Sequence, residues 1–498
     1  MRTLYDELNE YGHSDYYGFH MPGHKRNKNI TRVDLPYDID ITEITGFDDL
    51  HHAEGILQDA QERAAKLYHA EETHYLINGS TSGILSAILG STKRGDTILV
   101  ARNCHKSVYH AIYLNELKAE YVYPKYDKCR ELNGPVDPAD IRKALEKNVR
   151  AVKREINGVQ AVVEDKEKDF EGKIRAVVIV SPTYDGVLSY VREIADIVHE
   201  YGIPLIVDEA HGAHFGLHPY FPENANTKGA DIVIHSLHKT LPSLTQTALI
   251  HMNGNIVDRE SVRMYLHMLQ TSSPSYVLMA GMDACICTMQ ERGRELFDAY
   301  VEILKDIRAQ LQKLKWLKLV ETGEYDRSKL VLSVKNTGIT GNELHRRLQE
   351  QYHLEMEMAA VSYVLAMTTV GDTKEGLERL ADALFEIDAE LEKENRGNCE
   401  AGATFSFPRE EQNLSLPVLE QVYVSSEHGQ GACFSMKYKE SAGYVSAEYA
   451  YLYPPGIPVI VPGERISKEA AELLMRYEAA GFEISGVKHS GEIRVWKE

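Results

Sequence analysis

Short apolar runs rich in valine and isoleucine alternate with helical patterns between about residues 70 and 255, and this alternation limits the folds that the chain can adopt. The expected strands are Thr97–Ala101, Ile174–Val180, Pro204–Val207 and Asp231–His235. A helical pattern at Val191–Tyr201 separates the second strand from the third. Strands that alternate with helices predict an α/β fold with a mostly parallel sheet covered on both faces. Because such sheets bind ligands beyond the C-terminal ends of their strands, polar motifs at those ends are the first candidates for function.

The chain has 498 residues, more than one compact core holds, so several domains are expected. After about residue 275 the pattern changes, with helical spacing over 289–315 and 377–391 and a strand at Leu330–Val334. Asp372 or Thr373 is the expected N-cap of the second of these helices. This part is predicted to be a smaller α/β domain, followed by a polar linker over 393–413 and a last domain from about 414.

Charge and cysteine usage exclude several classes of protein. The net charge of −20 argues against binding to nucleic acid or to an anionic membrane surface. No stretch approaches the roughly 18 continuous apolar residues that span a membrane, and the acidic N-terminus is not a signal peptide. The six cysteines lack the paired spacing of a zinc site, so we expect a reduced, cytoplasmic protein. The charge-rich residues 142–173 are predicted to form a surface helix followed by a solvated excursion.

An ionisable residue follows each of two predicted strands. Asp208 comes directly after Pro204–Val207, and Lys239 lies four residues after Asp231–His235. If these strands are neighbours in the sheet, Asp208 and Lys239 meet in one cleft. An amine and a carboxylate are two groups that pyridoxal 5′-phosphate chemistry requires. The lysine forms a Schiff base with the cofactor, and the carboxylate keeps the pyridine nitrogen protonated so that the ring withdraws electrons.

The same cofactor needs a phosphate site and a flat side chain against its ring. The segment NGSTSG (78–83) precedes an apolar helical run, and a helix N-terminus favours an anion, although a simple helix cap explains such a cluster equally well. Ser236 and His238 are further candidates for phosphate donors, and His105 is a candidate for stacking on the ring. The pair His211 and His214 has no second ligand cluster at metal-site spacing, so no metal site is predicted.

With these motifs in order, the sequence closely resembles the fold-type I pyridoxal-phosphate enzymes that decarboxylate ornithine, lysine or arginine. The similarity extends over nearly the whole chain. The matching motifs are MPGHKR (21–26), DITEITGFDDLHHAEG (40–55), NGSTSG (78–83), ARNCHKS (101–107), SPTYDGV (181–187), VDEAHGAH (207–214), SLHKTLPSLTQTALIH (236–251), TSSPSY (271–276) and YPPGIPVIVPGE (453–464). Two apolar exchanges depart from the family pattern, Phe47 in place of leucine and Ala53 in place of proline.

The resemblance implies a role for each motif. Lys239 would be the Schiff-base lysine, Asp208 would pair with the pyridine nitrogen, His105 would stack on the ring, and His211 would lie close to the cofactor. Thr183 would lie near the O3′ side of the ring. The residues implied at the phosphate are Ser80, Thr81, Ser236 and His238.

The resemblance also implies a homodimer, which could assemble further, with the active site at the subunit interface. Ser272 and Ser273 would then reach the cofactor of the partner subunit. The implied fold is an aspartate-aminotransferase-like large domain over 31–300 with an N-terminal arm at 1–30. A small α/β domain at 301–395 and a C-terminal α+β domain at 414–498 complete it.

The expected reaction is decarboxylation of a basic amino acid to its amine and carbon dioxide for polyamine synthesis, with arginine favoured and lysine or ornithine open. Glu464 and Glu448 are candidates for binding the cationic end of the substrate, and the alternative is that both are surface glutamates. An aminotransferase is the nearest competitor, but residues 353–373 contain no arginine to clamp a substrate carboxylate. The other competing interpretation is a catalytically inactive regulatory dimer. The retention of Lys239, Asp208 and His105 argues against such a dimer.

Overall fold

The fold is described from a computed structural model of the chain. The described residues are 2–17, 19–29, 33–148, 150–156, 159–165, 172–400, 415–422 and 432–497. Contacts within the chain divide it into two units, and each is described by itself. The first unit comprises 1–93, 145–179 and 191–297, and the second comprises 94–144, 180–190 and 298–498.

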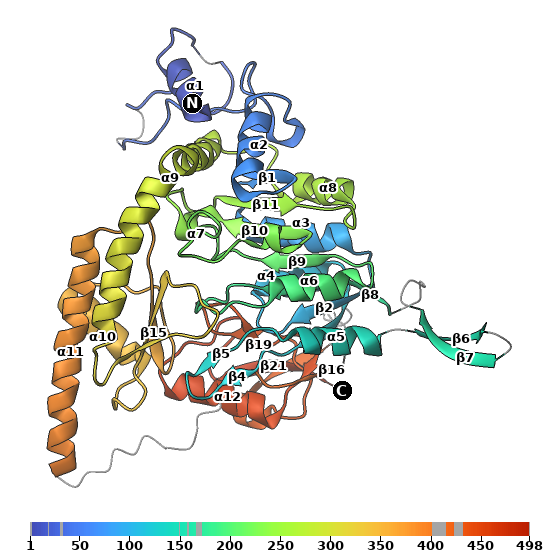
Figure 1. The fold of residues 1–498 in the computed structure, drawn as a ribbon, viewed down its shortest axis with the longest axis vertical. Helices are drawn as coiled ribbons and strands as arrows, with labels where there is room; N and C mark the ends of the chain where they lie inside the picture. The colour runs from blue at the N-terminus through green and yellow to red at the C-terminus, as the bar shows by residue number, and fades with distance from the viewer. Residues whose placement is uncertain are drawn as a thin grey trace. The chain divides into compact units, whose positions relative to one another are not determined.

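The first unit is built on a sheet whose strands follow the order β1-β11-β10-β9-β8 (Figure 1). The strands are β1 (Glu72–Leu76), β8 (Ile174–Val180), β9 (Leu205–Asp208), β10 (Ile232–Ser236) and β11 (Ala248–Met252). Strands β9 and β10 are parallel, whereas β11 is antiparallel to both of its neighbours, β10 and β1. All residues of β9, β10 and β11 are buried, which explains their continuous apolar sequences. The predicted strands of this unit are confirmed to within one residue at each end.

Helices cover this sheet, and two glycines allow close packing. The helices of this unit are α2 (Ile56–Tyr68), α3 (Gly79–Ser91), α6 (Val191–His199), α7 (Leu237–Thr240), α8 (Arg259–Leu269) and the part of α9 (Tyr276–Leu311) up to Phe297, together with α1 (Leu4–Gly12), which contacts α2. Helix α3 contacts β1, β10 and β11 on one side and α8 on the other. A Cβ atom on Gly83 would lie 2.5 Å from Leu76 Cδ1, and one on Gly90 would lie 2.7 Å from Val262 Cα. Position 90 therefore requires glycine because the backbone of α8 lies against it, whereas a methyl group at position 83 would displace the end of the Leu76 side chain.

The second unit contains a parallel pair, β2 (Thr97–Ala101) and β3 (Lys118–Val122), and helix α4 (Lys106–Leu114) between them. It also contains an antiparallel sheet of order β12-β13-β15-β14. The strands of that sheet are β12 (Lys318–Val320), β13 (Lys329–Ser333), β14 (Met358–Ala359) and β15 (Tyr363–Met367). Helix α10 (Gly341–Tyr352) contacts β14 and β15, and helix α11 (Lys374–Glu400) follows β15 in the sequence. The predictions of strands at Thr97–Ala101 and Leu330–Val334 are confirmed, the second with a shift of one residue.

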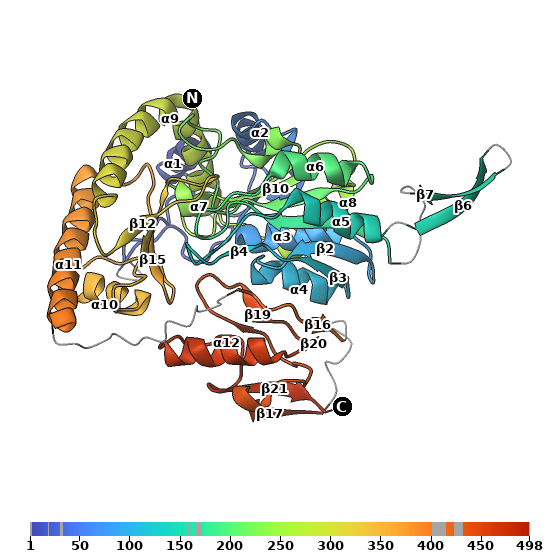
Figure 2. The same cartoon turned by 60° about the horizontal axis from the view of Figure 1, so that its bottom comes forward.

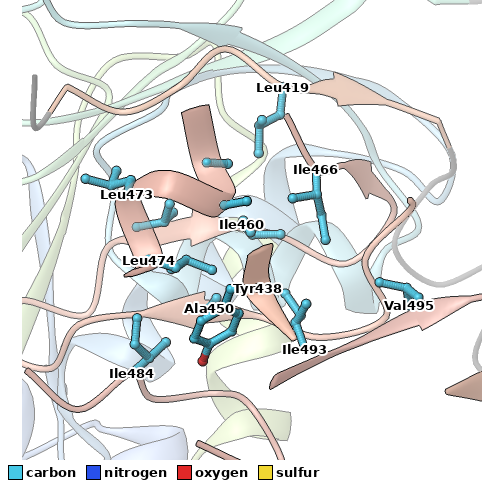
Figure 3. Packing of buried hydrophobic residues seen from close by; sticks show 13 residues of the cluster. Leu419, Tyr438, Ala450, Ile460, Ile466, Leu473, Leu474, Ile484, Ile493 and Val495 are labelled. Atoms are coloured by element: carbon cyan, nitrogen blue, oxygen red, sulfur yellow. The ribbon is translucent and has the colours of Figure 1, made fainter. Parts of the chain in front are cut away.

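The C-terminal part of the second unit (Figure 2) has its own apolar core (Figure 3). Its elements are β16 (Glu420–Gln421), β17 (Cys433–Lys437), β18 (Ala450–Tyr451), β19 (Pro458–Ile460), β20 (Glu464–Arg465), α12 (Lys468–Ala479) and β21 (Glu492–Trp496). Leu473 and Leu474 of α12 pack against Ile460, and Ile493 of β21 belongs to the same cluster (Figure 3). This core holds the segment 453–464 in place.

Three predictions of element bounds need correction. The helix expected at 289–315 is the second half of the longer α9. The helix expected at 377–391 begins after Thr373, whose Oγ1 accepts the Gly376 N–H, but it continues to Glu400 through the start of the predicted linker. The remainder of that linker, 401–413, lies outside the described residues.

The charged segment 142–173 also differs from the prediction. Helix α5 (Pro138–Lys147) is followed by an antiparallel pair of strands, β6 (Arg150–Ile156) and β7 (Val159–Asp165), where only a solvated excursion was expected. Residues 149, 157–158 and 166–171 lie outside the described residues. Within the described part of the chain, none of the helices combines the length and the apolar character needed to cross a lipid bilayer.

Candidate active site

Lys239 lies in α7, a single helical turn that follows β10 directly. Its Nζ is 3.0 Å from Nε2 of His211. Strands β9 and β10 are adjacent and parallel, with Asp208 in register with Ile234. The two strands are therefore neighbours, which is the condition for Asp208 and Lys239 to meet, and Asp208, His211 and Lys239 all lie at or just beyond the C-terminal ends of these strands.

The carboxyl group of Asp208 is buried and held by few protein groups. The side chain is 5% exposed, and its Oδ1 accepts the Ala210 N–H at 3.1 Å. Burial raises the pKa of Asp208, while the Lys239 ammonium and the Ala210 N–H oppose that rise. A carboxylate in this setting gains from a further cationic partner, and a protonated pyridine nitrogen is such a partner.

The segment 78–83 opens helix α3 in a way that leaves its N–H groups available. Asn78 occupies the N-cap position but makes no side-chain capping bond, so the alternative of a simple helix cap is not supported. Gly79 has a φ of +73°, a conformation that favours glycine. Ser80 is half-buried and Thr81 is exposed, while Ser82 Oγ donates to the Gly79 carbonyl.

Ser236 provides the observation that tests whether the cofactor fits. Its hydroxyl is fully buried at the end of β10 and has no hydrogen-bond partner among the described residues. A buried hydroxyl without a partner is unfavourable unless a ligand satisfies it. His238, on the next turn, donates from Nδ1 to the Thr247 carbonyl at 2.9 Å, which fixes the orientation of its ring. An amine, a carboxylate, an unpaired hydroxyl and a helix N-terminus fit the phosphate, ring and aldehyde of pyridoxal 5′-phosphate.

The loop after α8 places Ser272 and Ser273 on the surface of the first unit. The neighbouring Thr271 carbonyl accepts a hydrogen bond from His51 Nε2 at 2.9 Å. Exposure of both serines leaves them available to a second subunit. The described residues contain no group of three or more side chains arranged to hold a metal ion.

Two of the residues predicted to contact the cofactor belong to the second unit. His105 is the N-cap of α4, where its Nδ1 accepts the Ser107 N–H at 3.2 Å. Gly456 packs against that ring, since a Cβ at Gly456 would lie 3.3 Å from His105 Nε2, and the Gly456 carbonyl accepts the Lys106 N–H. Thr183 Oγ1 accepts the Val187 N–H within its own turn. That His105 and Thr183 approach the cofactor stays a prediction.

Comparison with models of protein families identifies the family to which the chain belongs. Residues 2–366 match the model described as Orn/Lys/Arg decarboxylase, major domain. Residues 414–488 match the model described as Orn/Lys/Arg decarboxylase, C-terminal domain. The chain belongs to the Orn/Lys/Arg decarboxylase family.

Individual relatives agree with this membership. The chain is 30% identical to an arginine decarboxylase of Halalkalibacterium halodurans, over 94% of this chain and 91% of the relative. It is 28% identical to an arginine decarboxylase of Bacillus subtilis, over 99% of this chain and 98% of the relative. Among solved structures, the lysine decarboxylase LdcF of Francisella novicida superposes with a TM-score of 0.81 at 20% identity, over 99% of this chain and 81% of that one. That likeness confirms the predicted fold class, and membership of the family makes this chain a pyridoxal-phosphate-dependent decarboxylase.

The geometry of this Orn/Lys/Arg decarboxylase family member argues against both residues suggested for the substrate's cationic end. Glu464 is fully buried, its carboxylate binds the Arg102 guanidinium at 3.1 Å, and it accepts the Val461 N–H at 2.7 Å. Glu448 is 9% exposed and accepts the N–H groups of Lys488 and Arg494. Glu448 is bonded within the C-terminal part and Glu464 joins that part to Arg102, so neither is the surface glutamate of the alternative and neither is open to a substrate.

Sequence reasoning missed two buried polar groups. The first is Arg102, which lies next to the predicted strand Thr97–Ala101 and is 0% exposed. The second is a hydrogen-bonded chain in the first unit formed by Thr73, Glu209, His235 and His251. Histidines inside the apolar sequences IVIHS and ALIHM were the available signal, because a histidine in a continuous buried strand needs a polar partner.

Proposed function

We propose that this enzyme decarboxylates arginine, with lysine and ornithine as the alternative substrates, and that the amine product serves polyamine synthesis. The contact between Lys239 and His211 beside the buried Asp208 carries the assignment of the catalytic centre. The choice of arginine is supported by the relatives named arginine decarboxylase, which match this chain over nearly their whole length.

The reaction gives a task to Lys239, to His211, to Asp208 and to the residues that bind the phosphate. When bound, the cofactor supplies a protonated ring that accepts the electron pair left as carbon dioxide departs. Lys239 holds the cofactor covalently and moves a proton at its Nζ. His211 Nε2, 3.0 Å from that Nζ, is positioned to receive or return this proton. Asp208 keeps the ring nitrogen protonated, and the phosphate is bound by Ser80, Thr81, Ser236 and His238.

We propose that His105 stacks on the ring, that Thr183 lies near its O3′ side, and that Ser272 and Ser273 reach the active site of a partner subunit. A homodimer is supported by the N-terminal arm, on which Tyr16, Tyr17, Phe19 and Met21 are 64–90% exposed. We further propose the four-part division into 1–30, 31–300, 301–395 and 414–498. A cytoplasmic location agrees with the exposed thiol of Cys129, since thiols stay reduced there.

The test uses the protein loaded with pyridoxal 5′-phosphate. It is incubated with arginine, lysine and ornithine in turn, and the amine and carbon dioxide released are identified by mass spectrometry and gas analysis. Borohydride reduction before digestion is expected to fix the cofactor on the peptide that contains Lys239. Modification of another lysine would refute the assignment of the centre, and a keto acid product in place of an amine would identify an aminotransferase.

A further inference from the structure

A continuous hydrogen-bonded chain of four side chains crosses the sheet of the first unit. Glu209 Oε2 lies 2.7 Å from His235 Nε2, His235 Nδ1 lies 3.0 Å from His251 Nε2, and His251 Nδ1 lies 2.7 Å from Thr73 Oγ1. The residues come from the end of β9 and from β10, β11 and β1, which are successive neighbours in the sheet (Figure 1). None of these four residues is more than 4% exposed. The reaction as described uses none of them.

The surroundings of the chain are mostly apolar and aromatic. The Tyr68 ring lies 4.7 Å from the His235 ring and 5.0 Å from the His251 ring, and its hydroxyl donates to the Ala213 carbonyl. From the other elements, Glu209 faces the Ala225 N–H, which its Oε2 accepts, while Lys228 and His214 oppose the rise of its pKa from farther away. Cys285 of α9 adds a neutral thiol near Tyr68. Burial outweighs these groups and raises the pKa of Glu209 to about 8, while burial lowers the pKa of both His235 and His251.

The hydrogen bonds can be completed in two ways that differ by one proton. With Glu209 ionised, His235 donates to it, His251 donates to His235, and the Thr73 hydroxyl donates to His251. With Glu209 protonated, every donor reverses, and Glu209 donates to His235, His235 to His251, and His251 to Thr73. Both arrangements satisfy every ring nitrogen, and only the second places no net charge in a site closed to water.

The first two members of this chain, Glu209 and His235, are each covalently joined to a residue of the active site. Glu209 follows Asp208 in the sequence, and His235 precedes Ser236. The bond between Glu209 and His235 therefore fixes the separation of the two strand ends that carry the ring partner and a phosphate donor. We propose that Glu209, His235, His251 and Thr73 form a neutral brace that carries one proton on Glu209 and positions Asp208 and Ser236 for the cofactor. This proposal rests on the roles given above to Asp208 and Ser236.

Infrared difference spectroscopy of the apoprotein, in the region of the carboxylic acid stretch, tests whether Glu209 carries the proton. Wild type at neutral pH is expected to show a protonated carboxyl band that disappears in Glu209→Gln and, in wild type, fades as the pH is raised past about 8. Asp283→Asn is the matched control, because Asp283 is equally buried but is ion-paired with Arg63 at 2.6 Å, so its replacement should remove no such band. A spectrum of Glu209→Gln that keeps the whole band would overturn the proposal.

Titration of the apoprotein with pyridoxal 5′-phosphate tests whether the brace positions Asp208 and Ser236 for the cofactor. In Glu209→Gln the amide oxygen can accept from His235 and Ala225, with the donors running in the direction described for ionised Glu209. The hydrogen bond to His235 is kept, so the dissociation constant of the cofactor should change less than about threefold. Glu209→Leu leaves His235 without its partner and should weaken binding about tenfold or more. Equal affinities for wild type, Gln and Leu variants, all folded by circular dichroism, would contradict a positioning role. If Asp208→Asn leaves cofactor affinity and absorption unchanged, the role of Asp208 fails instead, since the carboxyl band reports the chain alone.

Discussion

The buried ion pair between Arg102 and Glu464 makes a strong prediction about stability. Arg102 Nη1 donates to the Tyr109 hydroxyl and the Pro458 carbonyl, and Nη2 donates to the Val459 carbonyl and to Glu464. Neither side chain is exposed. Glu464→Gln removes the only carboxylate bonded to this guanidinium among the described residues. A buried charge left without its partner destabilises a protein by about 3–5 kcal/mol.

The chain offers a selective assay for this change. Its two tryptophans are Trp316 and Trp496, both in the second unit, so urea unfolding followed by tryptophan fluorescence reports the unit that contains the pair. Glu420→Gln is the matched control, because Glu420 pairs with Arg465 at 3.1 Å in the same C-terminal part but is 69% exposed. Loss of an exposed pair costs at most about 1 kcal/mol.

The same experiment separates the two roles considered for Glu464. A structural pair predicts a large loss of stability and, in the protein that remains folded, an unchanged order of preference among arginine, lysine and ornithine. A substrate ligand predicts the reverse, an unchanged unfolding curve and a raised KM for the basic substrate. Unfolding of Glu464→Gln within about 0.5 kcal/mol of wild type would refute the structural reasoning.

Three further predictions concern the first unit. Gly90→Ala should destabilise the protein by about 1–3 kcal/mol in thermal unfolding, because the added methyl group would lie 2.7 Å from Val262 Cα, whereas Gly23→Ala, with nothing within 4 Å, should not. Ser236→Ala should weaken cofactor binding several-fold without lowering apoprotein stability, since the hydroxyl has no partner among the described residues; a destabilised apoprotein would contradict this. Because the pKa of Glu209 rises from 4.5 to about 8 on folding, its contribution to stability is complete below pH 4.5 and is lost as the pH rises through about 8. The free energy of unfolding of wild type relative to Glu209→Gln should fall across that interval, and a constant difference would show that Glu209 does not hold the proton.

Patterns local in sequence predicted well, and contacts distant in sequence did not. The strands that end at Asp208 and precede Lys239 were found because a continuous run of valine and isoleucine needs burial on both faces. Their adjacency was only a condition of the prediction, and the structure shows that β9 and β10 are neighbours, which brings Asp208 and Lys239 to the same end of the sheet. The partner of Glu464, in contrast, lies 362 residues away in the sequence. A glutamate beside a turn looks exposed until its partner is known, and periodicity carries no information about that partner.

The bonds made by Arg102 have a consequence for how such a chain can change over time. The carbonyls of Pro458 and Val459 and the carboxylate of Glu464 all belong to the C-terminal part, and all are bonded to a residue that follows β2. A shortened gene that ended before residue 414 would leave a guanidinium with none of these acceptors. The region that contains Arg102 and the C-terminal part should therefore be inherited together. Where related genes differ at positions 102 and 464, both residues should change together, as a charged pair or as an apolar pair.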